Sequence, residues 1–432
     1  MEQFIYYIRI SLLSIKRAPL PYALTIFILS VGLGVFFANA TFYYQLNSDP
    51  LPHKSDKLFF PMTLIVPHDC NDCLPPRILS YSNVQKLSSS DIPSAKAAMY
   101  SANGYARLHA EQPPVPVTLR ITQRDFFSMF DVPLRHGSVW PDDNARDEVL
   151  LSRAMALKLF GRINVIGEQL LLDDRYFSVI GVLDHWQMLP RLYDANGRNH
   201  LSPGEDIFLP LETGYDLNYQ SRTNSRTFDQ TDYRKLSTEG RTGARHMLQY
   251  WVQLDTPAQQ QAYRQFMLNL ANAEKAAGRH PSPINNQLIA MADIVDYFGD
   301  DPGDIKAFAL VTLLFLLVCL FNASHLSLNR YLSNQYEFSL RRALGASRSQ
   351  LQQQMLADVL IMAAFTLVGA LLTGYACIQL MNQLLPNNSL FSHWNLTLLL
   401  SLLTITFACS YLVTLYPSLR ASFGNLNQQL KE

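Results

Sequence analysis

The sequence predicts a membrane protein with four transmembrane helices and a large α+β domain inserted between the first helix and the second. Long stretches of the chain carry no charge: no Asp, Glu, Lys or Arg occurs from Val359 to Leu419 or from Ala307 to Asn329. A helix needs about 20 mostly apolar residues to cross the hydrocarbon core of a bilayer. Between the first apolar stretch and the second lie roughly 250 hydrophilic residues, which are enough for an independent domain.

The apolar stretches divide into four expected spans, residues 22–45, 305–328, 357–384 and 394–417. The longest charge-free run holds two of them, because the turn residues Pro386-Asn387-Asn388-Ser389 interrupt it and leave a short loop at 385–393. Residues 1–21 combine apolar side chains with three basic residues, so we expect a helix at the membrane surface there.

Basic residues predict which side of the membrane each segment faces. Lys and Arg outnumber Asp and Glu in residues 1–21, 329–356 and 418–432, which by the positive-inside rule face the cytoplasm. Residues 46–303 carry more acidic than basic side chains and belong outside. We therefore expect a bacterial inner-membrane protein with both termini in the cytoplasm and its large domain in the periplasm. A cleaved signal peptide is the alternative interpretation of the first span, but no A-x-A-like site follows the apolar run.

The external block, residues 46–303, mixes strand and helix patterns. Lys57–Val66 and Val115–Ile121 are rich in β-forming residues, and Asp125–Phe130 carries a short helix signal. A strand at Gln249–Leu254 and a helix at Pro257–Ala277 close the block. These patterns predict an α+β domain with two subdomains.

The most ordered part of this block is a helix followed by a hairpin. Ser152 is placed to cap a helix over Ala154–Phe160, and Gly161 is placed to end it. Leu170–Leu172 and Tyr176–Leu183 follow as two strands joined at two aspartates. From Arg191 to Gly243 the composition shifts toward Asn, Arg, Thr, Gly and Asp, which predicts an insertion made of long loops.

Cys70 and Cys73 stand together in the external block. A disulfide that closes a tight loop in an oxidising compartment is the interpretation we favour. A zinc site would need four ligands. The sequence offers no second cysteine pair, and His68 alone cannot complete the set. Half of a metal site and a redox couple remain the alternatives, and we assign this pair no chemistry.

Enzymatic motifs are absent from the sequence. It contains no G-x-x-x-x-G-K-[ST] P-loop, no H-E-x-x-H and no G-x-S-x-G. Lys306 and Asp358 fall at expected span ends, and His325 is the one acid or base deeper inside, so no proton relay is expected. We predict a transport subunit without a cofactor or metal, whose energy is supplied by another protein.

The cytoplasmic loop, residues 329–356, has the pattern of two helices separated by a sharp stop. Glu337 and Arg341 are four residues apart in the favourable order, with Arg342 beside them. Gly345 is placed to end the first helix in the left-handed conformation, and Ser347 with Gln350 forms a capping box for the next. We expect a rigid docking element. The alternative is a solvated loop whose arginines only set topology.

Two segments resemble a known family. They are similar to signatures of the MacB-type permeases, which are the type VII ABC transporter subunits. The first segment is Tyr336-Glu337-Phe338-Ser339-Leu340-Arg341-Arg342-Ala343-Leu344-Gly345-Ala346-Ser347. The second runs from Leu159-Phe160-Gly161 through Val165-Ile166-Gly167 to Val179-Ile180-Gly181-Val182. The tail at Gly424–Gln429 departs from the family pattern. The resemblance implies that the 329–356 loop, through Glu337, Arg341, Arg342, Gly345, Ser347 and Gln350, contacts a separate ABC ATPase.

The resemblance also implies a mechanism and a set of partners. Two permease copies, or two homologous permeases, would dimerise, with Gly32 and Gly34 as candidate packing residues because small side chains permit close helix approach. ATP-driven motion would pass through the spans to the external domain and expel a substrate, with an antimicrobial peptide as the favoured cargo, through a membrane fusion protein and an outer-membrane channel. Membrane lipids complete the expected partners, and nucleic acid is not among them.

Three other functions fit the same topology. A lipoprotein-releasing permease would show a lipoprotein-binding groove in the external domain. A transmembrane regulator of cell-wall enzymes, of the FtsX type, usually has a smaller external domain than residues 46–303. A membrane-anchored enzyme would need a catalytic constellation there, and the sequence shows none.

Overall fold

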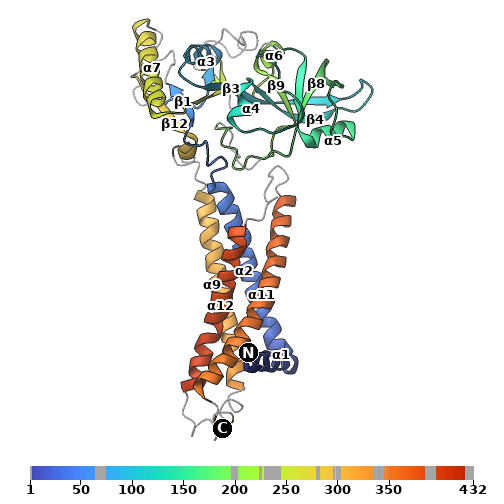
Figure 1. Ribbon diagram of the computed structural model, residues 1–432, viewed down its shortest axis with the longest axis vertical. Helices are drawn as coiled ribbons and strands as arrows, with labels where there is room; N and C mark the ends of the chain where they lie inside the picture. The colour runs from blue at the N-terminus through green and yellow to red at the C-terminus, as the bar shows by residue number, and fades with distance from the viewer. Residues whose placement is uncertain are drawn as a thin grey trace. The chain divides into compact units, whose positions relative to one another are not determined.

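The computed structural model describes residues 2–63, 74–143, 145–195, 203–222, 226–227, 245–278, 283–294, 297, 303–333, 340, 345, 347–384 and 396–423. The chain forms two compact units, drawn in Figure 1: one comprises Asn47–Asp301, and the other comprises Met1–Leu46 with Pro302–Glu432. Cys70 and Cys73 lie outside the described ranges, so the disulfide stays a prediction.

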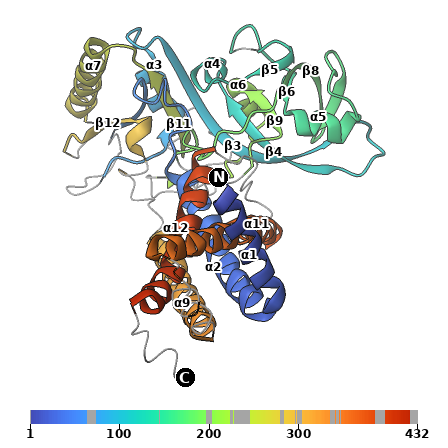
Figure 2. The same cartoon turned by 60° about the horizontal axis from the view of Figure 1, so that its bottom comes forward.

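The second unit is helical. Its helices are α1 (Glu2–Arg17), α2 (Pro19–Asn47), α9 (Gly303–Ser333), α11 (Arg348–Leu384) and α12 (Leu396–Phe423). Four of them contain stretches long and apolar enough to cross a membrane, over Pro19–Gln45, Ala307–Arg330, Gln352–Gln383 and Leu396–Thr414. The prediction of four long apolar helices is thereby confirmed. Helices α9 and α11 also extend into the 329–356 loop, and α1 lies beside α11 in both Figure 1 and Figure 2.

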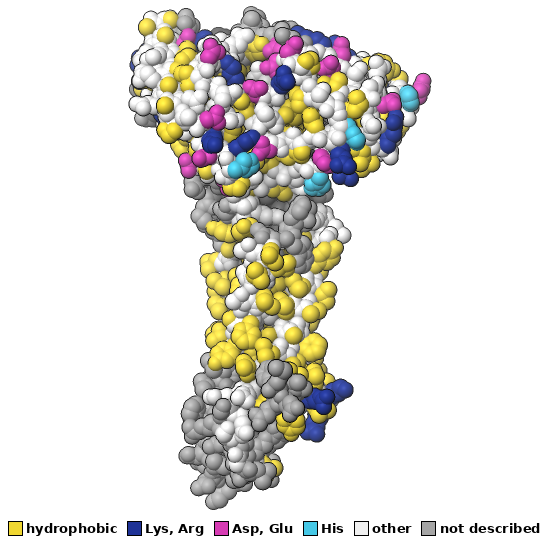
Figure 3. Space-filling model, in the orientation of Figure 1, with side chains coloured by type: hydrophobic (Ala, Val, Ile, Leu, Met, Phe, Trp, Pro, Cys, Tyr) yellow, Lys and Arg dark blue, Asp and Glu magenta, His cyan; other side chains and the backbone are white. Residues whose placement is uncertain are grey.

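The surface of the helical unit is apolar. Figure 3 shows hydrophobic side chains gathered over the middle of its visible face. On α9, Phe308 and Phe321 are 65% and 76% exposed. Side chains of this size are stable in that position when lipid replaces water around them.

The α+β unit is built on one large sheet. Its strands lie in the order β12-β1-β11-β3-β4-β9-β6-β8-β5, with β2 and β10 on β11 and with β7 pairing both β3 and β8. The strands are β1 (Leu58–Thr63), β2 (Leu79–Ser80), β3 (Ala95–Arg107), β4 (Val115–Thr122), β5 (Leu134–Gly137), β6 (Glu148–Leu151), β7 (Gln169–Leu172), β8 (Arg175–Leu183), β9 (Ile207–Pro210), β10 (Arg226–Thr227), β11 (Arg245–Gln253) and β12 (Asn286–Ala290).

Each face of this sheet carries its own hydrophobic core. Neighbouring residues alternate between the cores: Phe59 packs on one face and Phe60 on the other, as side chains in a strand do. Helices α3 (Tyr81–Ser88), α5 (Arg153–Phe160) and α7 (Pro257–Ala276) contribute to the first core, and α4 (Asp125–Met129) contributes to the second. The strands form one continuous sheet, and the division into two subdomains stays a prediction.

The predicted helix and hairpin are confirmed. The Ser152 hydroxyl accepts a hydrogen bond from the Met155 amide at 3.1 Å, and α5 ends at Gly161, whose φ is 69°. Strands β7 and β8 pair in antiparallel fashion across a turn in which Asp173 has a φ of 53°. Local signals were sufficient here because each cap and turn is specified by one or two residues.

The predicted insertion from Arg191 to Gly243 differs from the structure in its first part. Strand β9 lies between β4 and β6 in the sheet and is followed by α6 (Leu211–Asp216). The side chains of Tyr193 and Asp194 are buried. Polar composition misled the prediction because these polar groups bond to one another in the interior. Residues 228–244 are outside the described part of the chain.

Candidate functional site

The break before α11 has the local geometry expected from the sequence. Gly345 adopts a φ of 99°, in the left-handed region that favours glycine. The Ser347 amide donates to Oε1 of Gln350 at 2.9 Å, and the Gln350 amide donates to Oγ of Ser347 at 3.3 Å. This reciprocal pair is a capping box, and it starts α11 at a defined residue.

The capped start gives α11 a stiff connection into the membrane. This helix has 37 residues, so it spans roughly 55 Å at 1.5 Å per residue. Glu337, Arg341 and Arg342 lie outside the described residues, and their contacts with an ATPase stay a prediction.

Small residues bring α2 and α11 into close contact. A Cβ on Gly34 would overlap the side chain of Thr373, and a Cβ on Gly369 would overlap Ser30. The Thr373 hydroxyl donates to the Ser30 carbonyl at 2.8 Å, and the Ser30 hydroxyl donates to the Thr366 carbonyl at 3.3 Å. This combination of small side chains and interhelical hydrogen bonds is typical of helix packing in membranes.

The glycines expected at a dimer contact are thus used inside one chain. A Cβ on Gly32 would lie 2.8 Å from the Cβ of Cys319 on α9, and Gly34 meets α11. Close helix approach occurs as expected, but its partners are α9 and α11 of the same copy. The contact of these residues with a second permease copy stays a prediction.

Gly34→Leu should force α2 away from Thr373 and lower the free energy of unfolding by about 1–3 kcal/mol, the usual cost of overpacking. Ala23→Leu is the matched control, because Ala23 is exposed on the same helix. Thermal unfolding of the detergent-solubilised chain measures both. Equal midpoints for the two variants would contradict the α2–α11 contact.

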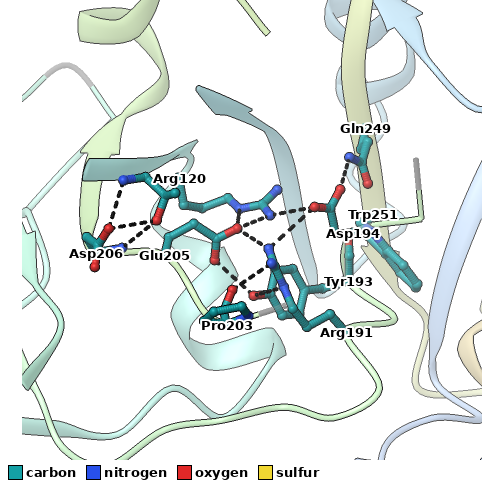
Figure 4. Close-up of polar contacts among 10 residues, drawn as sticks. Arg120, Arg191, Tyr193, Asp194, Pro203, Glu205, Asp206, Gln249 and Trp251 are labelled. Atoms are coloured by element: carbon teal, nitrogen blue, oxygen red, sulfur yellow. Dashed lines mark hydrogen bonds and ion pairs between the residues drawn. The ribbon is translucent and has the colours of Figure 1, made fainter. Parts of the chain in front are cut away.

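The α+β unit contains a buried network of charged groups, shown in Figure 4. Nε of Arg120, on β4, donates to Oε1 of Glu205 at 3.0 Å, and its Nη2 donates to Oδ2 of Asp194 at 3.1 Å. Arg191 also binds Glu205, and the Tyr193 hydroxyl donates to Oε2 of Glu205 at 2.9 Å. Two guanidinium groups thus face two carboxylates, and the pairing offsets the cost of burying charge.

The electrostatics of the network keep both carboxylates ionised. Burial by itself raises the pKa of Asp194, but Arg120 and Arg191 outweigh burial and lower that pKa to about 2. The pKa of Glu205 is likewise lowered by the two arginines against the effect of burial. The charges therefore persist at every physiological pH, and the network acts as a fixed support.

This network ties a loop to the centre of the sheet. The Trp251 indole, on β11, donates to the Tyr193 carbonyl at 3.0 Å, and Gln249 on the same strand donates to Asp194. The sequence did not predict this network because its residues come from distant positions. One signal was present: Arg120 is a charge inside the apolar run Val117-Thr118-Leu119-Arg120-Ile121.

A cavity of about 350 Å³ opens beside the network. Its walls include Leu157, Trp186 and Pro203, and Arg153 lies at its side in an ion pair with Asp184, whose Nη1–Oδ1 distance is 3.5 Å. Within the described ranges, no group of three or more His, Cys, Asp or Glu side chains is arranged to hold a metal ion.

Models of known protein families match both units of the chain. Residues 22–267 match the MacB-like periplasmic core domain, and residues 307–426 match the FtsX-like permease C-terminal region. No curated protein matches the chain.

Solved structures similar to the chain include two external domains. One is the extracellular domain of the noncanonic ABC-type transporter YknZ from Gram-positive bacteria, with 16% identity, a TM-score of 0.34, and coverage of 53% of this chain and 99% of that one. The other is the periplasmic region of MacB from Actinobacillus actinomycetemcomitans, with 13% identity, a TM-score of 0.37, and coverage of 58% of this chain and 95% of that one.

Proposed function

Because the chain belongs to the family of MacB/FtsX-type permeases, we propose that it is the permease subunit of an ATP-driven exporter. Members of this family are transmembrane subunits, and membership implies a partner ATPase. The absence of a P-loop from the sequence agrees with this division of labour. ATP is then bound and hydrolysed by the partner, and this chain converts the motion of the partner into work outside the membrane.

The observation that carries the proposal is the break at Gly345 followed by the capping box of Ser347 and Gln350. A flexible loop would absorb the motion of an ATPase. A helix whose first turn is fixed by a capping box, two residues after a glycine in the left-handed conformation, would pass the motion into α11. Residues 341 and 342 add two arginines to the same segment, suited to an acidic surface on the partner.

The proposed orientation and partners follow from the charge distribution and the family. Lys and Arg outnumber Asp and Glu in residues 1–21, 329–356 and 418–432, which supports cytoplasmic termini and a periplasmic α+β unit in the bacterial inner membrane. The working assembly comprises two permease copies, or this chain with a homologue, and the ATPase pair. A membrane fusion protein and an outer-membrane channel would carry a peptide cargo away.

The partnership is tested with purified protein. The chain alone should not hydrolyse ATP, and a separate ABC ATPase subunit from the same organism should bind it. Arg341→Glu together with Arg342→Glu should weaken that binding roughly tenfold or more, because two attractive charges become repulsive.

The matched control reverses Arg420 and Lys431, two charges expected on the same side of the membrane. It should leave binding unchanged. ATP turnover by the isolated chain, or equal binding by both double variants, would overturn the proposed partnership.

A second candidate function is favoured by the match of residues 307–426 to the FtsX-like permease C-terminal region. In that case the chain would signal to cell-wall enzymes and export nothing. The two functions differ in a measurable way. A deletion strain with altered cell-wall hydrolysis and unchanged export would select the regulator, whereas periplasmic accumulation of a cargo would select the exporter.

A further inference from the structure

Charged side chains from two spans meet an aromatic ring of a third inside the helical unit. The guanidinium carbon of Arg330, on α9, lies 4.0 Å from the centre of the Tyr22 ring on α2. Nη2 of the same arginine lies 3.7 Å from Oδ2 of Asp358 on α11. The Tyr22 hydroxyl donates to that carboxylate oxygen at 3.4 Å, which closes the group.

These charges are enclosed by protein. The side chain of Arg330 is 4% exposed and that of Asp358 is 15% exposed. Arg330 is the last residue of the apolar stretch Ala307–Arg330, and Asp358 lies near the start of the apolar stretch Gln352–Gln383. Charges in such places are expensive and persist where they are paired. Because removal of either charge would leave the other buried and unpaired, the pair holds α9 and α11 together at this level.

The position of the group along the chain gives it a role. Arg330 directly precedes residues 331–357, which contain Gly345, and Asp358 directly follows them. Their ion pair therefore links the two ends of this part of the chain. Helix α2 runs into the α+β unit at Asn47, and α9 begins at Gly303, directly after that unit. Helix α11 has no such connection. The group therefore joins the helix that starts at the Gly345 break to both helices that continue into the α+β unit.

We propose that Tyr22, Arg330 and Asp358 form a clasp that makes this end of α2, α9 and α11 move as one body. Its three members are positioning residues, and their task is to pass the displacement of α11 to α2 and α9. The proposal rests on the proposed function, because the displacement comes from the partner ATPase. Without the clasp, α11 would move while α2 stays in place.

The experiment compares hydrogen exchange with ATPase binding in the complex of the full chain and its partner ATPase. Exchange of the backbone amides of Leu20–Thr25, in the turns of α2 around Tyr22, is recorded with and without ATP and vanadate. The wild-type chain should show an ATP-dependent change there. Arg330→Gln and Asp358→Asn should each reduce that change about tenfold while binding the ATPase as tightly as the wild-type chain.

Two further variants separate positioning from a general loss of structure. The exchanged pair, Arg330→Asp with Asp358→Arg, should recover part of the exchange change, because the ion pair is restored while the ring contact is lost. Arg330→Lys keeps the charge and should lie between Arg330→Gln and the wild type. Arg17→Gln is the control, since it removes an exposed positive charge from the preceding helix.

The outcomes are distinct. A wild-type chain that binds no ATPase would overturn the proposed function. A wild-type chain that binds it and shows the exchange change, with Arg330→Gln and Asp358→Asn showing the same change, would overturn the clasp alone. The proposal would also be overturned if both single variants and the exchanged pair lost the exchange change and all three had lowered unfolding midpoints. The group would then contribute only to packing.

Discussion

Arg120→Met should lower the free energy of unfolding of the α+β unit by about 3–5 kcal/mol, the usual cost of removing one partner from a buried ion pair. Arg120 is fully buried and contacts both Glu205 and Asp194. Its removal leaves two buried carboxylates with a single guanidinium, that of Arg191. Denaturant unfolding of the full chain in detergent, followed by tryptophan fluorescence, measures the effect because Trp251 is hydrogen-bonded to this network.

Two matched variants test the cause. Arg162→Met removes an arginine from an exposed pair with Glu168 and should cost less than about 1 kcal/mol. Arg120→Met combined with Glu205→Leu removes both charges and should recover part of the loss, because the unpaired carboxylate is gone. An Arg120→Met chain that unfolds at the same denaturant concentration as Arg162→Met would show that the network contributes nothing to stability.

Gly345→Val should abolish export while leaving the protein inserted and folded. Gly345 has a φ of 99°, which a β-branched residue adopts at a cost of about 1–3 kcal/mol. Among the residues that the structure describes, none has an atom within 4 Å of the place where a Cβ would stand, so the expected effect is on the backbone conformation. The segment before Ser347 would turn to another direction, and ATP would be hydrolysed without transport.

The measurements are export, ATPase binding and ATP turnover on one preparation. Gly345→Asn is the control, because asparagine tolerates positive φ better than other side chains, and it should retain most of the export. Normal export by a well-inserted Gly345→Val protein would mean that the segment serves only as a topology signal. The proposed transmission of motion into α11 would then lose its main support.

The parts of the fold that the sequence predicted are those with local causes. A span needs only a long apolar run, and α5 needs only Ser152 and Gly161 at its ends. Strand β3, Ala95–Arg107, was missed because alanine and glycine are poor strand formers, and its place in the sheet comes from its neighbours β11 and β4.

In the candidate site too, local contacts were predicted from the sequence and long-range contacts were not. The capping box of Ser347 and Gln350 was predicted because its residues are three apart and bond to each other. The use of Gly34 against Thr373, and the meeting of Arg120 with Glu205, depend on residues brought together only by the tertiary fold. A single sequence carries no pairing signal between such distant positions, so these contacts required the structure.

Strand β3 also determines how the sheet responds to a pulling force. It pairs with β11 through its first residues, with β4 from Met99 to Ala106, and with β7 at its end, so one strand is shared by both halves of the sheet. A load applied along β3 would act in shear on its hydrogen bonds to β11, β4 and β7, so many of these bonds would have to break together. A slip of one residue would exchange the two cores, which forbids gradual creep. Under such a load we expect the sheet to keep its strand order, which runs from β12 at one end to β5 at the other.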